Sequence, residues 1–370
     1  MTAELLSLQH LVLFLAFLAS LAFGAVVQAT GFCTMGAVAD AVTLRDFTRG
    51  RQWALAAATA MLGFAALAFL GILTAPQTLY ASTRWLWLSA LAGGAVFGFG
   101  MVLSSGCVSK TLVRAGAGNL KSLVVSVVTG IAAFATLRGI TAVLRVATVD
   151  RVAVETGGNT DLATLLARGS GMSLAVAALV AGGVLGLALL AWSLAAKESR
   201  RPLNLLAGLG VGGSVLAMWW ITGHVGHLAE HPQTLEEAWI ATSSTRAEGL
   251  SFVAPTGYAL DWLLYFSDAN KRLTVGIVSV VGVLAGSALV ALARGRFRWE
   301  GFAGTGDLGH HLAGAVLMGV GGVTALGCSI GQGVTGLSTL SLGSLAATLA
   351  MVAGAVAGVR YQAWRIERDA

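Results

Sequence analysis

Nine stretches of about 20 mostly apolar residues dominate this 370-residue chain. They cover roughly residues 5–28, 52–74, 85–103, 119–142, 170–196, 203–222, 273–294, 309–326 and 341–362. A segment of this length crosses the hydrocarbon core of a bilayer as an α-helix, because its backbone polar groups are then paired within the segment. Only 11% of the residues are charged, and the mean hydropathy is +0.80, which excludes separate soluble domains. The sequence therefore predicts an all-α, multi-pass membrane protein with about nine transmembrane helices, forming one transmembrane domain over residues 1–370.

The distribution of Lys and Arg predicts the orientation of these spans. If the first loop is cytoplasmic, fifteen of the 23 basic residues lie on the cytoplasmic side and eight on the other. The cytoplasmic set is Arg45, Arg49, Arg51, Lys110, Arg114, Lys121, Lys197, Arg200, Arg201, Arg294, Arg296, Arg298, Arg360, Arg365 and Arg368. Because basic loops stay in the cytoplasm, we expect the N-terminus outside and the C-terminus inside. The same distribution explains the net charge of +6 without nucleic acid, and the absence of Lys and Arg from residues 1–10 indicates that the first span is retained.

The two halves of the chain match at a constant offset of 221 residues. Gly36 and Asp40 correspond to Gly257 and Asp261, and the dipeptide Gly106-Cys107 corresponds to Gly327-Cys328. Five predicted crossings separate the starts of the halves, so the second half enters the membrane from the opposite side. We therefore expect inverted repeats over about 1–145 and 203–370, with an inserted span at about 170–196 and short re-entrant helices.

All three cysteines of the chain, Cys33, Cys107 and Cys328, lie where an apolar span gives way to a glycine-rich break. Breaks at membrane depth are tolerated where the backbone is buried in protein or lines a polar cavity. Free N–H groups at the start of the next helix attract anions, and a thiol is a soft, weak hydrogen-bond donor. Together with the cations that follow Cys107, these breaks favour an anion with a terminal sulfur. The predicted transport path comprises Cys33, Cys107, Cys328, Gly106, Ser109, Lys110, Gly327, Ser329 and Gln332.

Other interpretations of the thiols remain open at this point. A single membrane cysteine is usually a small buried hydrophobe. A membrane sulfurtransferase or thiol oxidoreductase would also use cysteine, although no Cys-x-x-Cys pair is present. A cysteine-lined metal transporter is a third possibility, but Lys110 and Arg114 disfavour the passage of cations.

Three long motifs resemble the YeeE/YedE-type family of bacterial thiosulfate importers, and the resemblance covers essentially the whole chain. The motifs are Gly31-Phe32-Cys33-Thr34-Met35-Gly36-Ala37, Gly106-Cys107-Val108-Ser109-Lys110-Thr111-Leu112-Val113-Arg114 and Gly327-Cys328-Ser329-Ile330-Gly331-Gln332-Gly333. The resemblance implies an hourglass-shaped importer of the inner membrane that hands thiosulfate between three cysteines. We accordingly expect no enzymatic activity and no cofactor, and we expect any TusA-like sulfur-carrier partner to be a separate cytoplasmic protein. Another sulfur or selenium species remains an alternative substrate.

Two further groups of polar residues need an interpretation. His224, His227 and His231 lie close together in an outer loop, where zinc is conceivable, but no cysteine or clear carboxylate completes a site. We expect a solvated loop helix without metal there. The related residues Asp40 and Asp261 suggest either ion coupling or a structural role, such as pairing with Arg51 and Arg272.

Overall fold

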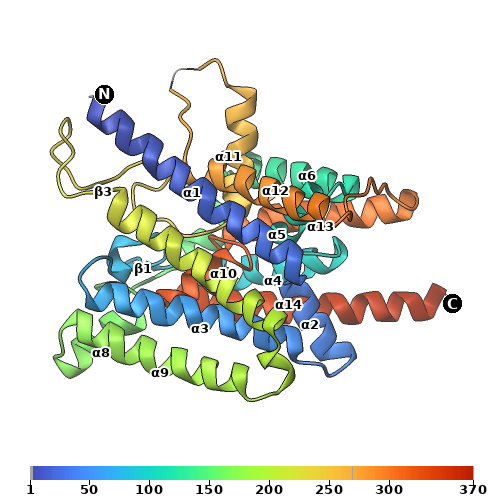
Figure 1. The fold of residues 1–370 in the computed structure, drawn as a ribbon, viewed down its shortest axis with the longest axis horizontal. Coiled ribbons are helices and arrows are strands. Elements are labelled where there is room, and N and C mark those ends of the chain that lie inside the picture. The colour runs from blue at the N-terminus through green and yellow to red at the C-terminus, as the bar shows by residue number, and fades with distance from the viewer. Residues whose placement is uncertain (1–2, 269, 370) are drawn as a thin grey trace.

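The computed structural model describes residues 3–268 and 270–369, and its regular structure is almost entirely helical (Figure 1). The α-helices are α1 (Ala3–Thr30), α2 (Thr34–Thr43), α3 (Thr48–Phe69), α4 (Trp87–Leu103), α5 (Val108–Gly116), α6 (Leu120–Arg138), α7 (Ile140–Ala147), α8 (Leu162–Ser170), α9 (Leu174–Leu194), α10 (Pro202–Trp220), α11 (Val253–Leu264), α12 (Val275–Ala293), α13 (Thr305–Thr324) and α14 (Leu342–Asp369). Short 3-10 or π-helical turns are η1 (Ala75–Gln77), η2 (Val149–Arg151), η3 (Glu198–Arg200), η4 (Ile221–Val225) and η5 (Gly331–Gly336). The prediction of an all-α protein is confirmed.

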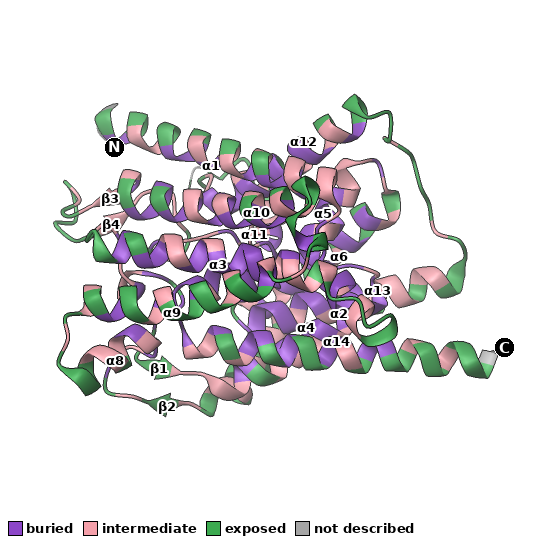
Figure 2. Cartoon of the chain, turned by 60° about the horizontal axis from the view of Figure 1, so that its bottom comes forward, coloured by how far each residue is buried: buried purple, intermediate pink, exposed green. Residues whose placement is uncertain are grey.

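Two very short antiparallel strand pairs are the only sheets in the described chain. Strand β1 (Arg84–Trp85) pairs with β2 (Val154–Glu155), and β3 (His227–Leu228) pairs with β4 (Ala238–Trp239). Both pairs tie together loops at the end of the molecule that carries the N-terminus (Figure 2). They organise the loops in front of the site described below.

Eight segments of the described chain are long and apolar enough to cross a membrane, which establishes a multi-pass membrane protein. They coincide with eight of the nine predicted spans. The ninth, residues 309–326, is helical as α13 but is not among them, so the predicted number of nine is corrected to eight by length and composition. The reason is the polar start of α13, which carries Asp307, His310 and His311. Because α13 packs against α4 and α6, much of its surface is covered by protein and need not be strongly apolar.

Glycine-mediated packing holds the central helices close together. A Cβ added at Gly98 of α4 would lie 2.0 Å from the carbonyl oxygen of Met351 on α14, and one at Gly321 of α13 would lie 2.5 Å from the nitrogen of Phe97 on α4. A Cβ at Gly286 of α12 would lie 2.0 Å from the carbonyl oxygen of Leu21 on α1. Small residues let helix backbones approach in this way, which is how helices gain packing energy in lipid.

The buried and exposed surfaces agree with a membrane location. In Figure 2 the long helices α1, α10, α3 and α9 run side by side in that order, with buried residues toward the centre of the bundle and exposed residues outside. The exposed residues include large apolar side chains, such as Val184 (64% exposed) and Leu187 (58% exposed) on α9. Such a surface suits hydrocarbon rather than water.

The two ends of the chain lie at opposite ends of the molecule (Figures 1 and 2). Near the C-terminal end, loops predicted to be cytoplasmic contact one another. Arg294 donates to the carbonyl of Ala29 at 3.0 Å, and Lys121 pairs with Asp307 at 2.9 Å. We call this the inner end and the opposite one the outer end, with the orientation in the membrane still a prediction.

The two related aspartates form ion pairs. Asp40 at the end of α2 pairs with Arg49 at 3.3 Å, and Asp261 at the end of α11 pairs with Lys271 at 2.5 Å. The predicted partner of Asp40, Arg51, instead lies over the ring of Trp192 at 5.4 Å. The structural role expected for these carboxylates therefore fits, but Asp40 uses a different arginine, because Arg51 points to α9 rather than back to α2.

Candidate functional site

The three cysteines follow backbone breaks of the same geometry. The residue two positions before each cysteine has a left-handed backbone, with φ of 72° at Gly31, 56° at Ser105 and 59° at Leu326. Glycine adopts this conformation freely, whereas Ser and Leu do so at a cost of about 1 kcal/mol or more. The helices before the second and third breaks close alike, since Gly106 N–H donates to Met101 O and Gly327 N–H donates to Gly322 O at 2.9 and 2.8 Å. Three matched breaks of this kind indicate a shared role for the residues that follow them.

Each cysteine stands at the start of the next helical segment. Cys33 is the N-cap of α2, and its sulfur accepts the N–H of Gly36 at 3.3 Å. Cys107 is the N-cap of α5, and its sulfur lies 3.3 Å from the hydroxyl of Ser109. Cys328 precedes η5, and its sulfur accepts the N–H of Gly331 at 3.3 Å. The thiols therefore lie at the ends of helical segments where N–H groups point outward and favour negative charge.

The three thiols are free, buried and close to one another. Their residues are 8%, 1% and 0% exposed for Cys33, Cys107 and Cys328. Cys107 is near enough to interact electrostatically with both of the others. These interactions place Cys107 between the other two in the order Cys328, Cys107, Cys33, and we call this set of three the thiol line.

Basic side chains surround the inner end of this line. Lys110 on α5 is in electrostatic range of Cys33 and Cys107, and also of Arg49 and Arg114. Arg114 donates to the carbonyl of Ser105 at 2.7 Å and so holds the left-handed break in place. In a partly dry site such cations act on an anion more strongly than they would in water.

A polar inner cavity of about 990 Å³ adjoins these residues. Its lining includes four cationic side chains, Arg114, Lys121, Arg296 and Arg298. It also contains Glu300 and Asp307, so that the lining is basic overall. An anion leaving the thiol line would meet positive charge here before reaching solvent.

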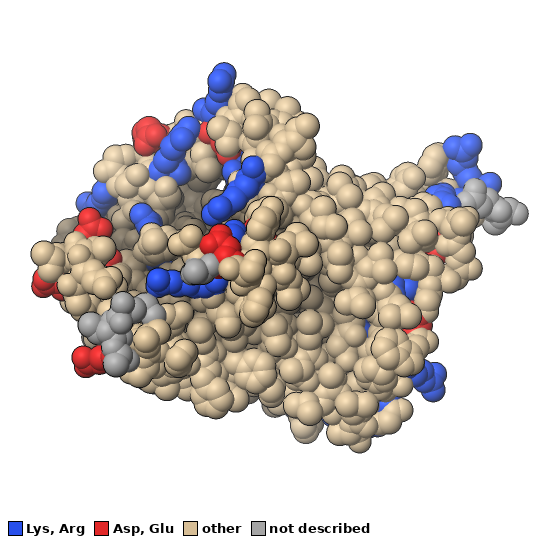
Figure 3. Space-filling view, turned by 90° about the horizontal axis from the view of Figure 1, so that it is seen from above, with Lys and Arg blue, Asp and Glu red and all other residues tan. Residues whose placement is uncertain are grey.

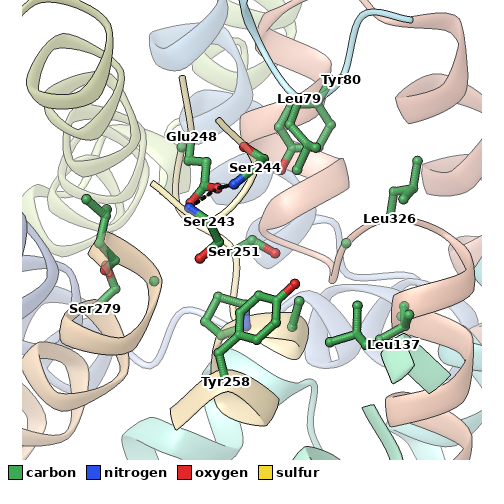
Figure 4. A pocket seen from close by; sticks show the side chains of 18 of the residues that line it. Leu79, Tyr80, Leu137, Ser243, Ser244, Glu248, Ser251, Tyr258, Ser279 and Leu326 are labelled. Atoms are coloured by element: carbon green, nitrogen blue, oxygen red, sulfur yellow. Dashed lines mark hydrogen bonds between the residues drawn. The ribbon is translucent and has the colours of Figure 1, made fainter. Parts of the chain in front are cut away.

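Two adjoining outer cavities lie next to the segment that holds Cys328, at the other end of the thiol line. The first, which we call the Glu248 cavity, has about 910 Å³ and extends to Gly327, the residue before Cys328 (Figure 4). The second, the Arg246 cavity, has about 870 Å³ and is lined by Arg84, Arg246 and Gln332. Tyr80 lines both cavities and interacts electrostatically with Cys328. Seen from above, Lys and Arg side chains gather around a hollow toward the N-terminal end of the molecule (Figure 3).

The structure brings the predicted path residues together around the three breaks. Ser109 contacts Cys107, and Gly106 and Gly327 form the two matched turns. Gln332 donates to the carbonyl of Ala325 at 2.5 Å, while its side-chain oxygen is buried without a partner in the described chain and faces the Arg246 cavity. The hydroxyl of Ser329 is likewise buried and unpartnered, but it faces a different, mainly apolar cavity beside α2 and α14. The roles of these residues in transport stay predictions.

Sequence reasoning missed the outer residues of the site. Tyr80, Arg246 and Glu248 lie in loops and Arg84 in the short strand β1, none of which carries a motif. They meet only through the packing of segments far apart in the chain. The one available signal was the concentration of polar residues in long outer loops. That signal does not identify which of them face a cavity.

Two of the three outer histidines contact acidic or aromatic side chains close to them in the chain. His227 pairs with Glu237 at 2.8 Å and packs on Trp239 across the β3–β4 pair, while His224 packs on Trp220. No group of three or more His, Cys, Asp or Glu side chains in the described residues could hold a metal ion. The expected loop helix is wrong for His227, because this segment forms a strand pair.

Comparison with known proteins places the chain among sulfur transporters. A family model described as sulphur transport matches residues 29–357. A thiosulfate transporter, TsuA of Escherichia coli, is 29% identical over 320 residues, which cover 84% of this chain and 83% of that protein. A protein of the same name from Spirochaeta thermophila is 25% identical over 355 residues, covering 90% and 93%.

Proposed function

The chain belongs to the sulphur transport family, and we propose that it takes up thiosulfate across the bacterial inner membrane by passing the anion along Cys328, Cys107 and Cys33. The observation that carries this proposal is the line of three buried thiols between the outer cavities and the basic inner cavity. The names of the two relatives support thiosulfate as the substrate. Membership of a transport family argues against an enzyme.

The chemistry of the path suits a soft dianion. Each cysteine lies at the start of a helical segment, where the backbone N–H groups favour an anion, and each thiol can donate a weak hydrogen bond to a terminal sulfur. At Cys328 the backbone N–H groups of Phe252 and Ile330 also approach the sulfur, so the starts of α11 and η5 converge on it. Neutral donors of this kind hold a dianion less tightly than a direct ion pair would, so the anion can leave each position again.

An inverted repeat over about 1–145 and 203–370 is part of the proposal. The order α2, α3, α4, α5, α6 is matched by α11, α12, α13, η5, α14, and the left-handed residues Ser105 and Leu326 are 221 positions apart. The packing partners also correspond, with α1 on α12 and α10 on α3, and α4 on α14 and α13 on α6. Such folds place substrate near the membrane midplane at broken helices. An experimental structure in which no rotation of about 180° relates the halves would contradict the repeat.

The electrical cost of uptake is large for a dianion. Moving one charge against 100 mV costs about 2.3 kcal/mol, so two negative charges cost about 4.6 kcal/mol when the cell interior is negative. Either rapid consumption of thiosulfate inside or the binding of a proton must offset this cost.

Purified protein in liposomes should accumulate labelled thiosulfate, whereas empty liposomes should not. Excess unlabelled thiosulfate should suppress this uptake, and sulfate should suppress it less because sulfate lacks the soft terminal sulfur. Mass spectrometry of the three cysteines during transport distinguishes the alternative of a membrane sulfurtransferase. A persulfide that forms and decays at the rate of uptake would replace the transport proposal with that enzyme.

The proposed orientation puts the loop before α11 outside the cell and the C-terminus inside. In a variant with the native cysteines replaced by serine, a cysteine at exposed Glu230 should react with a membrane-impermeant maleimide added to intact cells. A cysteine at exposed Arg368 should react only after the cells are opened. If the cysteine at position 368 reacted in intact cells and the one at position 230 did not, the membrane orientation would be the opposite of the proposed one. The proposed direction of the transport path would then be reversed as well.

A further inference from the structure

Glu248 is a carboxylate inside the outer cavity, on the route to Cys328. It lies in the loop that leads to α11 and lines the Glu248 cavity together with Tyr80, Tyr258 and Ser251 (Figure 4). One of its carboxylate oxygens accepts the backbone N–H groups of Ser243 and Ser244 at 2.8 and 2.7 Å. The side chain is therefore fixed in place at the cavity wall.

No cation in the described residues pairs with this carboxylate. Arg145, which also lines the cavity, pairs with Asp150 at 3.5 Å. Arg246, two residues before Glu248 in the chain, donates instead to the carbonyls of Thr78 and Ala81. An ionised Glu248 would therefore put an uncompensated negative charge where a dianion has to pass.

The other groups around Glu248 do not supply that missing positive charge. Tyr80 faces it from the loop before α4 and interacts in turn with the thiol of Cys328. Tyr258 faces it from α11 and also interacts electrostatically with Arg138 and Asp261. Burial raises the pKa of the Glu248 carboxyl, and the N–H groups of Ser243 and Ser244 oppose that shift.

We propose that Glu248 is a proton-binding site whose protonation is linked to the binding of the anion in the outer cavity. The inference rests on the proposed uptake of an anion. When the dianion approaches, repulsion favours the neutral carboxyl, so a proton is taken from the outer solution; the same linkage makes anion binding tighter at low pH. A metal cation is disfavoured as the ligand, because Glu248 is the only carboxylate among the residues that line the described cavity.

The test compares wild type, Glu248→Gln and a control, Glu230→Gln, in proteoliposomes. Glu230 is an exposed carboxylate of the same outer loop region. Initial uptake of labelled thiosulfate is measured from pH 5.5 to 8.5, with equal pH on both sides and no membrane voltage. For wild type and the control, we expect the half-saturating concentration to rise by up to about tenfold per pH unit above the pKa of Glu248, as linkage to one proton requires. Glu248→Gln should show the low-pH value throughout.

The outcomes separate this inference from the proposed function. Lack of uptake by wild type at every pH would reject anion transport itself. Uptake that is independent of pH in wild type, or equally pH-dependent in Glu248→Gln, would overturn the proton site alone. A folded Glu248→Gln protein that is inactive at every pH would show that the charged carboxylate is needed, and this would also overturn the proton site. The same conclusion would follow if wild type required sodium for uptake and Glu248→Gln did not.

A second measurement needs no variant. Thiosulfate added to weakly buffered, detergent-solubilised wild-type protein should be accompanied by the uptake of up to about one proton per bound anion near neutral pH. Sulfate at the same concentration serves as the control for ionic strength. Binding of thiosulfate without any proton uptake across pH 5.5 to 8.5 would overturn the inference even if Glu248→Gln fails to fold.

Discussion

Replacing Cys107 with alanine is expected to reduce thiosulfate uptake by roughly ten- to hundredfold while leaving the protein in the membrane. A hydrogen bond to a charged partner is worth about 1.5–3 kcal/mol, and each 1.36 kcal/mol changes a rate about tenfold. Cys107 is the thiol that lies within electrostatic range of both other thiols. Its loss removes the middle position of the line, so the anion would have to pass from Cys328 to Cys33 without a stop.

Three comparisons make this prediction specific. Cys107→Ser keeps a donor but loses the soft sulfur, so it should restore uptake only in part. Cys33→Ala and Cys328→Ala should each impair uptake, but less severely, because each removes one end of the line. Ser214→Ala, which removes a buried hydroxyl bonded to Gly210 on α10, controls for the loss of a buried polar group away from the path. Normal uptake by Cys107→Ala would show that the thiols are packing residues.

The membrane-spanning segments and the breaks between them could be predicted from the sequence because both depend on local composition. Eight of the nine apolar stretches are candidate spans, and all three predicted breaks occur where Cys33, Cys107 and Cys328 stand. Each of these cysteines has a glycine one or two positions before it, and glycine permits tight turns, so the sequence indicated a break there. The predicted number of spans was too high by one, at α13. This helix packs against α4 and α6, so its surface can be less apolar than that of a helix facing lipid.

The details of the breaks required the structure. The left-handed residues at the second and third breaks are Ser105 and Leu326, not the glycines that follow them. Neither residue type favours this conformation, so no local rule predicts it. The surrounding fold imposes it, in part through the hydrogen bond from Arg114 to the carbonyl of Ser105.

The outer part of the site was beyond sequence reasoning for a different reason. Tyr80 and Glu248 lie far apart in the sequence, and only tertiary packing brings them to one cavity. Isolated polar residues in loops look alike in a sequence. Their roles depend on which of them face a cavity, and that depends on contacts between distant helices.

Gly98→Val should weaken the fold itself, with an expected loss of stability of about 3 kcal/mol, the upper end of the usual cost of overpacking. Gly98 lies in the middle of α4, where a Cβ would come 2.0 Å from the carbonyl oxygen of Met351 and 2.9 Å from the nitrogen of Ala355 on α14. Both atoms belong to a helix backbone, so they cannot move aside as a flexible side chain would. The helices would have to separate, and α4 leads directly into the break at Cys107.

A matched glycine on a lipid-facing helix provides the control. A Cβ at Gly183 of α9 would have no neighbouring atom within 4 Å, so Gly183→Val introduces the same side chain without a collision. Thermal unfolding in detergent and the amount of folded protein in membranes should fall sharply for Gly98→Val and change little for Gly183→Val. Since proteins are stable by only about 5–15 kcal/mol, a loss of this size removes a large share of that stability and should also reduce uptake. Equal stability of the two variants would mean that α4 and α14 do not pack as closely as the structure indicates, and the position of the Cys107 break would then have to be revised with them.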